Sequence, residues 1–429
     1  MLIKNFWQKN YKKVIPFLIL GIIVLIGHFV FTKNSVQTTT IKTTAEKSTQ
    51  TQTTEQEATT PKTPAEEFAT ENIKTLQKQT QQNNLLTKQV GQMLILGFRG
   101  TQYQENSFID KAIKDLKISG VVLFDIDAPS GIFPRNIVSP EQVKKLTTEL
   151  QQHSATPLLV SIDVEGGLVN RLKSKYGFME VPSATELGKG TPENTFQIAK
   201  KLGEQLKNLG INFDFAPVVD LNINPQNPII GKLGRSFSDN PDIVIAQAES
   251  FINGLTQSNI ITSIKYFPGH GSSQTDSHQG ITDVTNTYQA KELIPFQDLI
   301  KKNIVRAVMV AHTFNKNLDE NYPATMSVNT IQKTLKDLVG FNGVVVCDDL
   351  SMGAISQNYG LAEAAVKMVE AGCDLLIISN NVSSYDETLP YQVQNAILQA
   401  TNNGEIATSS IEASYNKIIK LKNDFKVIK

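Results

Sequence analysis

The chain has 429 residues, and its 41 lysine and arginine residues balance its 41 aspartate and glutamate residues, so the formal net charge is zero. Without a basic surplus, the composition speaks against a nucleic-acid-binding protein, and we expect no nucleic-acid partner. The two cysteines, Cys347 and Cys373, lie in or beside apolar runs, so we expect them to be buried as small hydrophobic side chains, not as a disulfide framework or metal site.

The amino end carries a hydrophobic run, Val14–Thr32, in which His28 is the only ionisable side chain. At about 1.5 Å per residue, the run is long enough to cross a hydrocarbon core of roughly 30 Å. Lysines precede it and no second such run follows, so the positive-inside rule places the amino end in the cytoplasm. We predict a cytoplasmic stub and transmembrane signal-anchor over residues 1–33, in a single-pass protein of the cell membrane whose main domain is extracytoplasmic. A cleaved signal peptide is the alternative, but no small-x-small pattern follows the run.

Residues 34–80 are rich in threonine and glutamine, and up to about residue 65 they contain almost nothing apolar to bury. Such a segment cannot offset the entropy that ordering it would cost. We therefore predict a disordered linker over residues 34–80, followed by one large domain over residues 81–429.

Short apolar runs rich in β-branched residues recur eight times in this domain. They are Met93–Phe98, Gly120–Phe124, Leu158–Ile162, Ile211–Pro217, Ile261–Lys265, Ala307–Ala311, Val344–Val346 and Leu375–Ile378. Continuous apolar strands are typical of a parallel sheet that helices cover. Stretches with helical spacing lie between them, for instance Asn106–Leu116, Pro140–Gln152, Glu193–Leu209, Asp242–Gln257, Lys291–Lys301, Val328–Leu338 and Leu361–Ala371. This alternation predicts an α/β fold, a (β/α)8 TIM barrel.

Polar side chains follow most of the predicted strands. Asp163 follows the third strand, Asp220 the fourth, His312 the sixth, Asp348 the seventh and Ser379 the eighth, and Lys265 ends the fifth. Because a barrel builds its site from the carboxyl ends of its strands and the loops that follow them, we expect these side chains to converge on one mouth.

Two segments carry the residue types that cleavage of a sugar linkage requires, namely Lys265–His278 and Cys347–Met352. Hydrolysis with retention needs a nucleophile under the anomeric carbon and a separate acid for the leaving oxygen. Asp348 suits the nucleophile, because the apolar run before it would hold its carboxylate on a rigid strand. We expect Asp349 to be structural, for instance as a helix cap.

The acid is predicted to be His278, since residues 272–278 contain no glutamate. A carboxylate from Asp276 that accepts one ring N–H would fix the tautomer and raise the basicity of the other nitrogen. A surface turn in which Asp276 bonds its own backbone is the alternative reading.

Three cations, Lys265, Arg171 and Arg235, are candidates for holding sugar hydroxyls or an acidic substituent, although solvated or salt-bridged positions are their ordinary alternative. For His270, in Pro-Gly-His-Gly, contact with substrate and stabilisation of the turn both stay open. No HExxH or CxxC spacing, calcium loop or phosphate-binding glycine loop is present, so we expect no metal and no cofactor.

At these residues the chain resembles glycoside hydrolase family 3, and within it the bacterial β-N-acetylglucosaminidases (β-N-acetylhexosaminidases) that act on peptidoglycan fragments. The resemblance covers roughly Leu85 to the end. Its motifs are Val90–Phe98, Ser161–Gly167, Asp214–Asp220, Gly234–Phe237, Lys265–His278 and Cys347–Met352. It implies a single barrel as the catalytic domain.

The resemblance also implies roles for single residues. The residue matching Asp348 is the nucleophile of that family, and the one matching His278, paired with the one matching Asp276, is its acid/base. The positions that bind the sugar match Asp163, Arg171, Arg235, Lys265 and Tyr266.

Three positions depart from the pattern of the family. Tyr266 stands where histidine is usual, Leu168 where arginine is common, and Ser272 where aspartate is frequent. The three catalytic positions are intact, so the departures bear on how sugar hydroxyls and a neighbouring lactyl or peptide group are held.

We therefore expect a membrane-tethered retaining β-N-acetylhexosaminidase that acts on GlcNAc-containing cell-wall glycans or muropeptides. A β-glucosidase or β-xylosidase of the same family is one alternative, against which the Asp276–His278 pair argues. A tethered glycan-binding protein without activity is the other, and the retained Asp348 counts against it.

Overall fold

The computed structural model describes residues 64–428, so the predicted anchor and the predicted linker up to residue 63 lie outside the described residues. Residues 64–80, which the sequence assigned to the linker, form the first part of helix α2 (Pro64–Gly91). Proline at the helix start and the many Glu, Gln, Lys and Leu residues favour this helix. Between residues 64 and 428, the structure contains no helix with the length and apolar character that a bilayer crossing requires.

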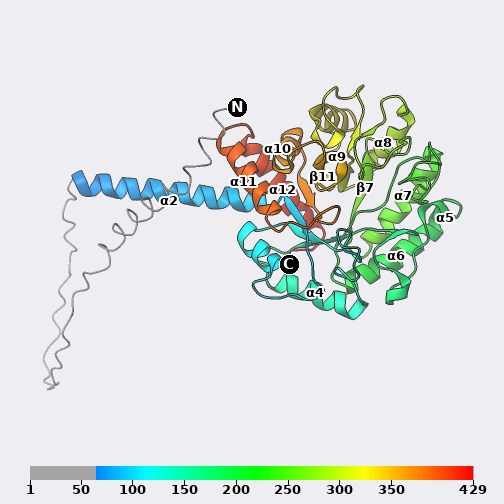
Figure 1. The fold of residues 1–429 in the computed structure, drawn as a ribbon, viewed down its shortest axis with the longest axis horizontal. Coiled ribbons are helices and arrows are strands. Elements are labelled where there is room, and N and C mark those ends of the chain that lie inside the picture. Colours follow the sequence, from blue (N-terminus) through cyan, green and yellow to red (C-terminus); the bar gives the residue numbers. More distant parts are fainter. Residues whose placement is uncertain (1–63, 429) are drawn as a thin grey trace, which may run out of the picture. The chain divides into compact units, whose positions relative to one another are not determined.

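Eight parallel strands close into a barrel, as the sequence predicted (Figure 1). They are β1 (Leu94–Gly97), β2 (Gly120–Val122), β3 (Leu159–Ile162), β6 (Phe213–Asp214), β7 (Ile261–Phe267), β9 (Ala307–Val310), β11 (Val344–Cys347) and β12 (Leu375–Ile378). Neighbours in the barrel are neighbours in the chain, and β1 pairs with β12 to close it. Each of the eight predicted strands is therefore confirmed.

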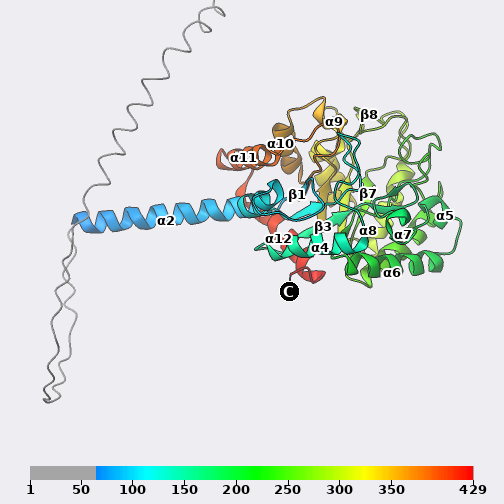
Figure 2. The same cartoon turned by 60° about the horizontal axis from the view of Figure 1, so that its bottom comes forward.

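Helices surround the barrel (Figures 1 and 2). Those within or close to the predicted ranges are α3 (Phe108–Lys111), η1 (Ala112–Leu116), α4 (Pro140–Gln152), α6 (Pro192–Asn208), α7 (Pro241–Thr256), η3 (Ala290–Leu293), α8 (Ile294–Lys301), η5 (Asn329–Leu338) and α10 (Leu361–Ala371). The others are α5 (Ala184–Gly188), α9 (Gly353–Ser356), α11 (Leu389–Asn402), α12 (Thr408–Asp424) and the short turns η2 (Ser174–Tyr176) and η4 (Ala324–Met326).

Three of these helices begin with the same local signal, a polar residue followed by proline. Ser139 precedes α4, Thr191 precedes α6 and Asn240 precedes α7, and each side chain accepts a hydrogen bond from a backbone N–H of the first turn. Such a cap stabilises a helix by about 1 kcal/mol. Because proline has the φ of a first helical residue and lacks an N–H, the pair marks the start of the helix in the sequence itself.

Short strands also lie in the loops that follow the carboxyl ends of β3, β7 and β9. β4 (Val164–Gly166) and β5 (Val169–Asn170) form a hairpin after β3. β8 (Thr282–Asp283), in the loop after β7, pairs with β10 (Thr313–Phe314), which follows β9. These pairings stiffen the loops that carry the predicted site residues.

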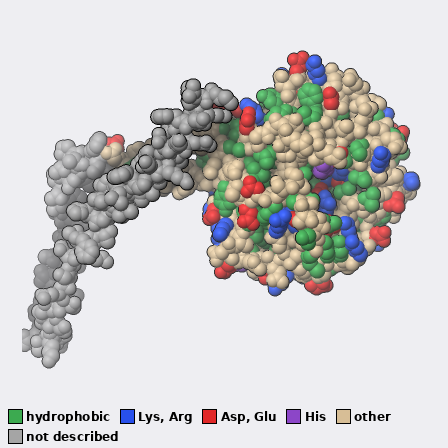
Figure 3. Space-filling view, in the orientation of Figure 1, with side chains coloured by type: hydrophobic (Ala, Val, Ile, Leu, Met, Phe, Trp, Pro, Cys, Tyr) green, Lys and Arg blue, Asp and Glu red, His purple; other side chains and the backbone are tan. Residues whose placement is uncertain are grey.

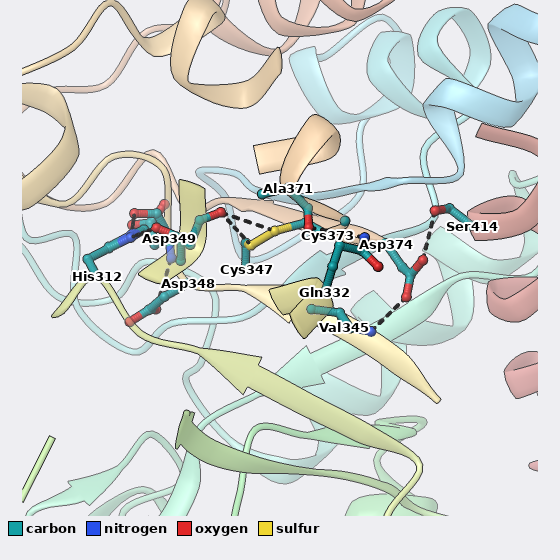
Figure 4. Close-up of a disulfide and its surroundings, with 12 residues drawn as sticks. His312, Gln332, Val345, Cys347, Asp348, Asp349, Ala371, Cys373, Asp374 and Ser414 are labelled. Carbon is teal, nitrogen blue, oxygen red and sulfur yellow. Dashed lines mark hydrogen bonds between the residues drawn. A yellow bond between two sulfur atoms is a disulfide. The ribbon is translucent and has the colours of Figure 1, made fainter. Parts of the chain in front are cut away.

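The expectation for the cysteines was right about burial and wrong about bonding. Cys347 and Cys373 are both buried and form a disulfide with Cα atoms 5.8 Å apart (Figure 4). Cys347 ends β11 and Cys373 lies just before β12, and these two strands are neighbours in the barrel. The pairing of the strands brings the sulfur atoms together, which the spacing of the cysteines in the chain did not reveal.

Candidate active site

A cavity of about 460 Å³ opens at the carboxyl ends of the strands. Its polar lining consists of Asp125, Asp163, Arg171, Lys173, Arg235, Tyr266, Asp276, His278, Asp348, Asp349, Ser379 and Asn381. Apolar side chains, among them Val122, Phe124, Phe215, Met309, Met352 and Ile377, form the rest of its wall. In Figure 3, histidine, acidic and basic side chains gather near the middle of the barrel face.

Asp348 stands at the end of β11, whose four residues are all buried. The backbone N–H of Asp348 donates to the carbonyl of Val310 on β9, and its own Oδ1 accepts from the N–H of Asp349 at 2.8 Å. The carboxylate is therefore held on a rigid strand end and lines the cavity, as expected for a group that must reach a bound ligand.

The side chain of His278 is half exposed and lines the same cavity as Asp348. Its ring Nδ1 lies 2.8 Å from Oδ1 of Asp276, which leaves Nε2 available to a ligand. Burial disfavours the charged ring, but the hydrogen bond to Asp276 and the charges of Asp276 and Asp348 outweigh it and raise the pKa of His278. The Asp276 carboxylate also accepts from the backbone N–H of His278 at 2.8 Å, so both turn and side-chain pairing are present.

Lys265 is fully buried and does not line the cavity. Its Nζ lies 2.8 Å from Asp163 and 2.6 Å from Glu165, so it supports the wall of the cavity from behind. Burial disfavours its charge, yet the two carboxylates raise the pKa of Lys265 above the usual range. Burial likewise opposes the charge of Asp163, but Lys265 and Arg171 lower the pKa of Asp163 to about 2. Both charges are retained because they are paired.

Arg235 lines the cavity with its guanidinium almost fully committed to the protein. Nε and Nη2 donate to the two carboxylate oxygens of Glu165, both at 2.7 Å, and Nη1 donates to the carbonyl of Ile229. Nη2 also donates to the hydroxyl oxygen of Tyr266 at 2.6 Å. Tyr266, where the family pattern has histidine, is thus locked against Arg235. Glu165 bridges Arg235 and Lys265, a role that the sequence did not reveal.

Arg171 has more freedom to meet a ligand. Its side chain is 33% exposed, and its Nη2 lies 3.6 Å from Asp163, beyond hydrogen-bond distance. Its guanidinium carbon lies 5.4 Å from the ring centre of Phe124. Arg171 therefore retains donor capacity at the cavity wall.

His270 does not reach the cavity, so the prediction that it contacts substrate is not supported. It is buried, with Nδ1 2.7 Å from Ser273 Oγ and Nε2 3.3 Å from Ser277 Oγ. Burial lowers the pKa of His270 to about 4, and the neutral ring ties together the loop that leads to His278. The turn role, the other reading of Pro-Gly-His-Gly, is the one that the structure favours.

Two buried carboxylates hold the backbone of that loop. Asp220 accepts from the N–H groups of Tyr266 at 3.3 Å and His270 at 2.7 Å. Glu292 accepts from the N–H of Ser272 at 3.1 Å. Burial raises the pKa of Asp220 to about 7 and also raises that of Glu292. The sequence placed Asp220 at a strand end without a role. Glu292 lies in η3, within the predicted helical stretch Lys291–Lys301, and nothing in the sequence indicated that it would contact this loop.

Asp349 and His312 are structural, although both follow strands. Oδ1 of Asp349 accepts from the N–H of Ser379 at 2.9 Å and of Ser351 at 3.1 Å, and its other oxygen accepts from the Ser379 hydroxyl. His312 is buried, with Nε2 2.9 Å from the Asp349 carbonyl. Figure 4 shows His312 beside the two aspartates at the end of β11. Within residues 64–428, no group of three or more His, Cys, Asp or Glu side chains is arranged to hold a metal ion.

Several known proteins are similar to this chain. Beta-hexosaminidase of Idiomarina loihiensis is 34% identical over 303 residues, which cover 68% of this chain and 88% of that protein. Beta-hexosaminidase A of Pseudoalteromonas piscicida is 31% identical over 318 residues, and the match spans 68% of this chain but only 52% of that protein.

Among solved structures, a glycoside hydrolase family 3 β-N-acetylglucosaminidase from Paenibacillus sp. str. FPU-7 superposes with a TM-score of 0.72 at 35% identity, over 80% of this chain and 62% of that one. Residues 85–421 match the family described as Glycosyl hydrolase family 3 N terminal domain. A match over that much of the chain shows that the protein belongs to glycosyl hydrolase family 3.

Proposed function

We propose that the protein is a retaining β-N-acetylhexosaminidase that releases terminal β-linked GlcNAc from peptidoglycan-derived glycans or muropeptides. The observation that carries the proposal is that Asp348 and the hydrogen-bonded pair Asp276–His278 line one cavity at the mouth of the barrel. The names of the similar proteins, hexosaminidases and a β-N-acetylglucosaminidase, support GlcNAc as the sugar that is released.

In the first step, the Asp348 carboxylate attacks the anomeric carbon and forms a glycosyl ester while the bond to the leaving oxygen breaks. Imidazolium His278 donates its Nε2 proton to that oxygen, because its Nδ1 is held by Asp276. In the second step, the neutral ring takes a proton from water, which attacks the anomeric carbon and releases Asp348. Two displacements at the same carbon give overall retention.

The wall of the cavity supplies orientation. Asp163 is an ionised acceptor, and the partly exposed guanidinium of Arg171 retains donor capacity, so together they suit neighbouring sugar hydroxyls. Lys265, which is itself paired with Glu165, holds Asp163 in place from behind. Tyr266 and Arg235 form the adjoining part of the wall.

The test compares turnover of an aryl β-N-acetylglucosaminide with that of the matching β-glucoside, with and without inorganic phosphate. The proposal expects strong preference for the former and free GlcNAc as the product. Asp348→Asn should lower kcat by about 10⁴-fold or more. Asp239→Asn, at an exposed carboxylate, is the matched control and should leave kcat unchanged.

A 5-fluoro analogue of a β-N-acetylglucosaminyl donor tests the covalent step. Such an analogue should add one glycosyl mass to the wild-type protein, and peptide mapping should locate it at Asp348. Labelling at another residue, or an α-anomer as the first product in NMR, would contradict the mechanism.

The hydrophobic run Val14–Thr32 supports a further part of the proposal, a membrane anchor with the barrel on the extracytoplasmic side. Full-length protein should stay in the membrane pellet after alkaline carbonate extraction, and protease added to intact spheroplasts should degrade the barrel. Recovery in the soluble fraction would refute the anchor.

A further inference from the structure

The cavity has two unlike halves. One half carries the charged residues of the proposed chemistry, with Asp348, His278 and the cluster around Lys265. The other half comes from the loops after β2 and β12, through Phe124, Asp125, Ile126, Ala128, Ser379, Asn381 and Val382. The proposed mechanism uses residues of the first half and none of the second, whose own carboxylate, Asp125, is paired with Lys173 at 2.7 Å.

The loop after β2 continues from the cavity onto an exposed apolar hairpin. Ile126, which lines the cavity, is 38% exposed, and on the opposite arm Ile132 is 62% and Phe133 41% exposed. Cross-arm hydrogen bonds lie on both sides of these residues, from Asp127 N–H to Ile132 O at 2.9 Å and from Arg135 N–H to Asp125 O at 2.8 Å. The three apolar side chains therefore belong to one small folded unit.

The hairpin is backed by an aromatic stack. The ring of Phe133 lies parallel to that of Tyr176 in η2, with centroids 4.6 Å apart and planes inclined by 14°. Tyr176 comes from the loop after β3, so the stack joins two loops of the barrel mouth. With Tyr176 against it and much of Phe133 still exposed, Phe133 presents aromatic surface to solvent.

A buried arginine fixes the hairpin to the opposite wall of the second half of the cavity. Arg135 is 1% exposed, and its guanidinium donates to Asp127 at 2.6 Å, to the carbonyls of Ser379 at 3.0 Å and Asn380 at 3.1 Å, and to Asn381 Oδ1 at 2.8 Å. A surface held in this way loses little conformational entropy when a ligand binds. Exposed apolar side chains on a rigid rim thus suit ligand binding.

We propose that Phe133, with Ile126 and Ile132, binds the second sugar ring of the substrate, on the leaving-group side of the scissile bond. This inference rests on the proposed function. In the chair form of a gluco-configured pyranose the hydrogens on C2 to C5 are axial, so both faces carry C–H groups that pack against an aromatic ring. The substrate class is then an oligosaccharide or glycan with a sugar as its leaving group.

The size of the surface favours a sugar over a macromolecule. A stable protein interface needs roughly 20 to 30 residues on each side. The hairpin offers three exposed apolar side chains, of which Ile126 lines the cavity while Ile132 and Phe133 lie outside its lining on the opposite arm.

The experiment measures kcat/KM of Phe133→Ala with chitotriose and with β-N-acetylglucosaminyl fluoride, whose leaving group has no ring. Loss of one aromatic contact should lower kcat/KM for chitotriose by about tenfold. The value for the fluoride should stay within about twofold of wild type, because catalysis on the first sugar is untouched. Phe133→Trp should restore the value for chitotriose. Leu338→Ala, at an equally apolar side chain that is 69% exposed at the end of η5, is the control and should change neither value.

Each other outcome overturns the inference or the proposal beneath it. Equal losses with both substrates mean that Phe133 is only structural. No loss with either means that the hairpin does not bind the leaving sugar and serves a protein or membrane partner, or nothing. A wild-type protein that cleaves neither substrate refutes the proposed function, a result distinct from a failure of Phe133→Ala alone.

Discussion

Two fully buried lysines of this barrel have different electrostatic surroundings, one with carboxylate partners and one with neutral acceptors. Lys265, at the carboxyl end of β7, has Asp163 and Glu165 within 2.8 Å, which keep it charged. Within residues 64–428, the acceptors of Lys422, on α12, are Gln92 Oε1 at 2.8 Å and the carbonyl of Ser119 at 2.9 Å. Burial and the nearby charge of Lys88 lower the pKa of Lys422 to about 7.

Lys265 is a buried charge that belongs to the proposed site, whereas Lys422 is a buried amine whose contacts stabilise the fold. At the mouth, cations and carboxylates are paired so that charge persists in a desolvated wall, where it can orient a substrate. In the part of the chain that the structure describes, the amine on α12 has neutral acceptors and no counter-charge. Four predictions test this contrast, from the largest expected effect to the smallest.

Lys265→Met should have the largest effect, because it leaves Asp163 and Glu165 as buried carboxylates without their shared cation. Removing one partner of a buried pair costs about 3–5 kcal/mol of stability. Activity on the aryl β-N-acetylglucosaminide should be lost as well. Urea unfolding and steady-state kinetics measure both. If Lys265→Met is as stable as wild type, the cluster does not depend on this charge.

Asp276→Asn should lower kcat/KM by roughly 10²- to 10⁴-fold, because the partner that orients His278 is lost. The Asp276 carboxylate contributes most to raising the pKa of His278, so its removal lowers that pKa. Since His278 must be protonated to act as the acid, the alkaline limb of the pH profile should move to lower pH. An unmoved alkaline limb would show that another group supplies the proton.

Asp220→Asn should alter how stability depends on pH. The pKa of Asp220 is raised to about 7 in the folded state, against about 3.9 in the unfolded chain. Between these values the folded protein holds a proton that the unfolded chain has lost, so this group makes stability fall as pH rises. The stability of wild type relative to the variant should therefore fall from about pH 4 to pH 7. Parallel melting-temperature curves would contradict the raised pKa.

Lys422→Met should have the smallest effect, because replacing a buried amine by an apolar side chain of similar length is often neutral or stabilising. The pKa of Lys422 is about 7 when folded and about 10.4 when unfolded. The unfolded chain binds more protons in this range, so wild type should gain stability relative to the variant from about pH 7 to pH 10. Kinetic constants should not change, and a loss of activity would tie α12 to the site.

The local sequence was a good guide wherever one segment carries the signal. Continuous apolar runs predicted all eight barrel strands, because a strand covered by helices buries both faces. Asp163, Asp348 and the Asp276–His278 pair could be predicted to meet, because the carboxyl ends of parallel strands share one mouth. The polar residue and proline before α4, α6 and α7 marked helix starts in the same local way.

The sequence was a poorer guide where a partner distant in the chain decides what a residue does. For His270 the sequence left substrate contact and a role in the turn both open. Local bonds to Ser273 and Ser277, and the bond from its backbone N–H to Asp220, 50 residues away, hold it in the interior. The cysteines are joined because β11 and β12 pair. In both cases the deciding neighbour depends on how strands and loops pack.

By itself, the sequence determined the barrel, the order of its strands and the strand ends that carry the catalytic candidates, since these follow from short-range hydrophobic pattern and residue type. Only the tertiary structure decided that Glu165 joins Arg235 to Lys265, that Asp220 and Glu292 hold the loop before His278, and that Arg135 ties the Phe133 hairpin to the loop after β12. The physical reason is that barrel closure sets such contacts. It brings together groups such as Lys265 and Asp163, which are 102 residues apart, in a register that neither segment encodes alone.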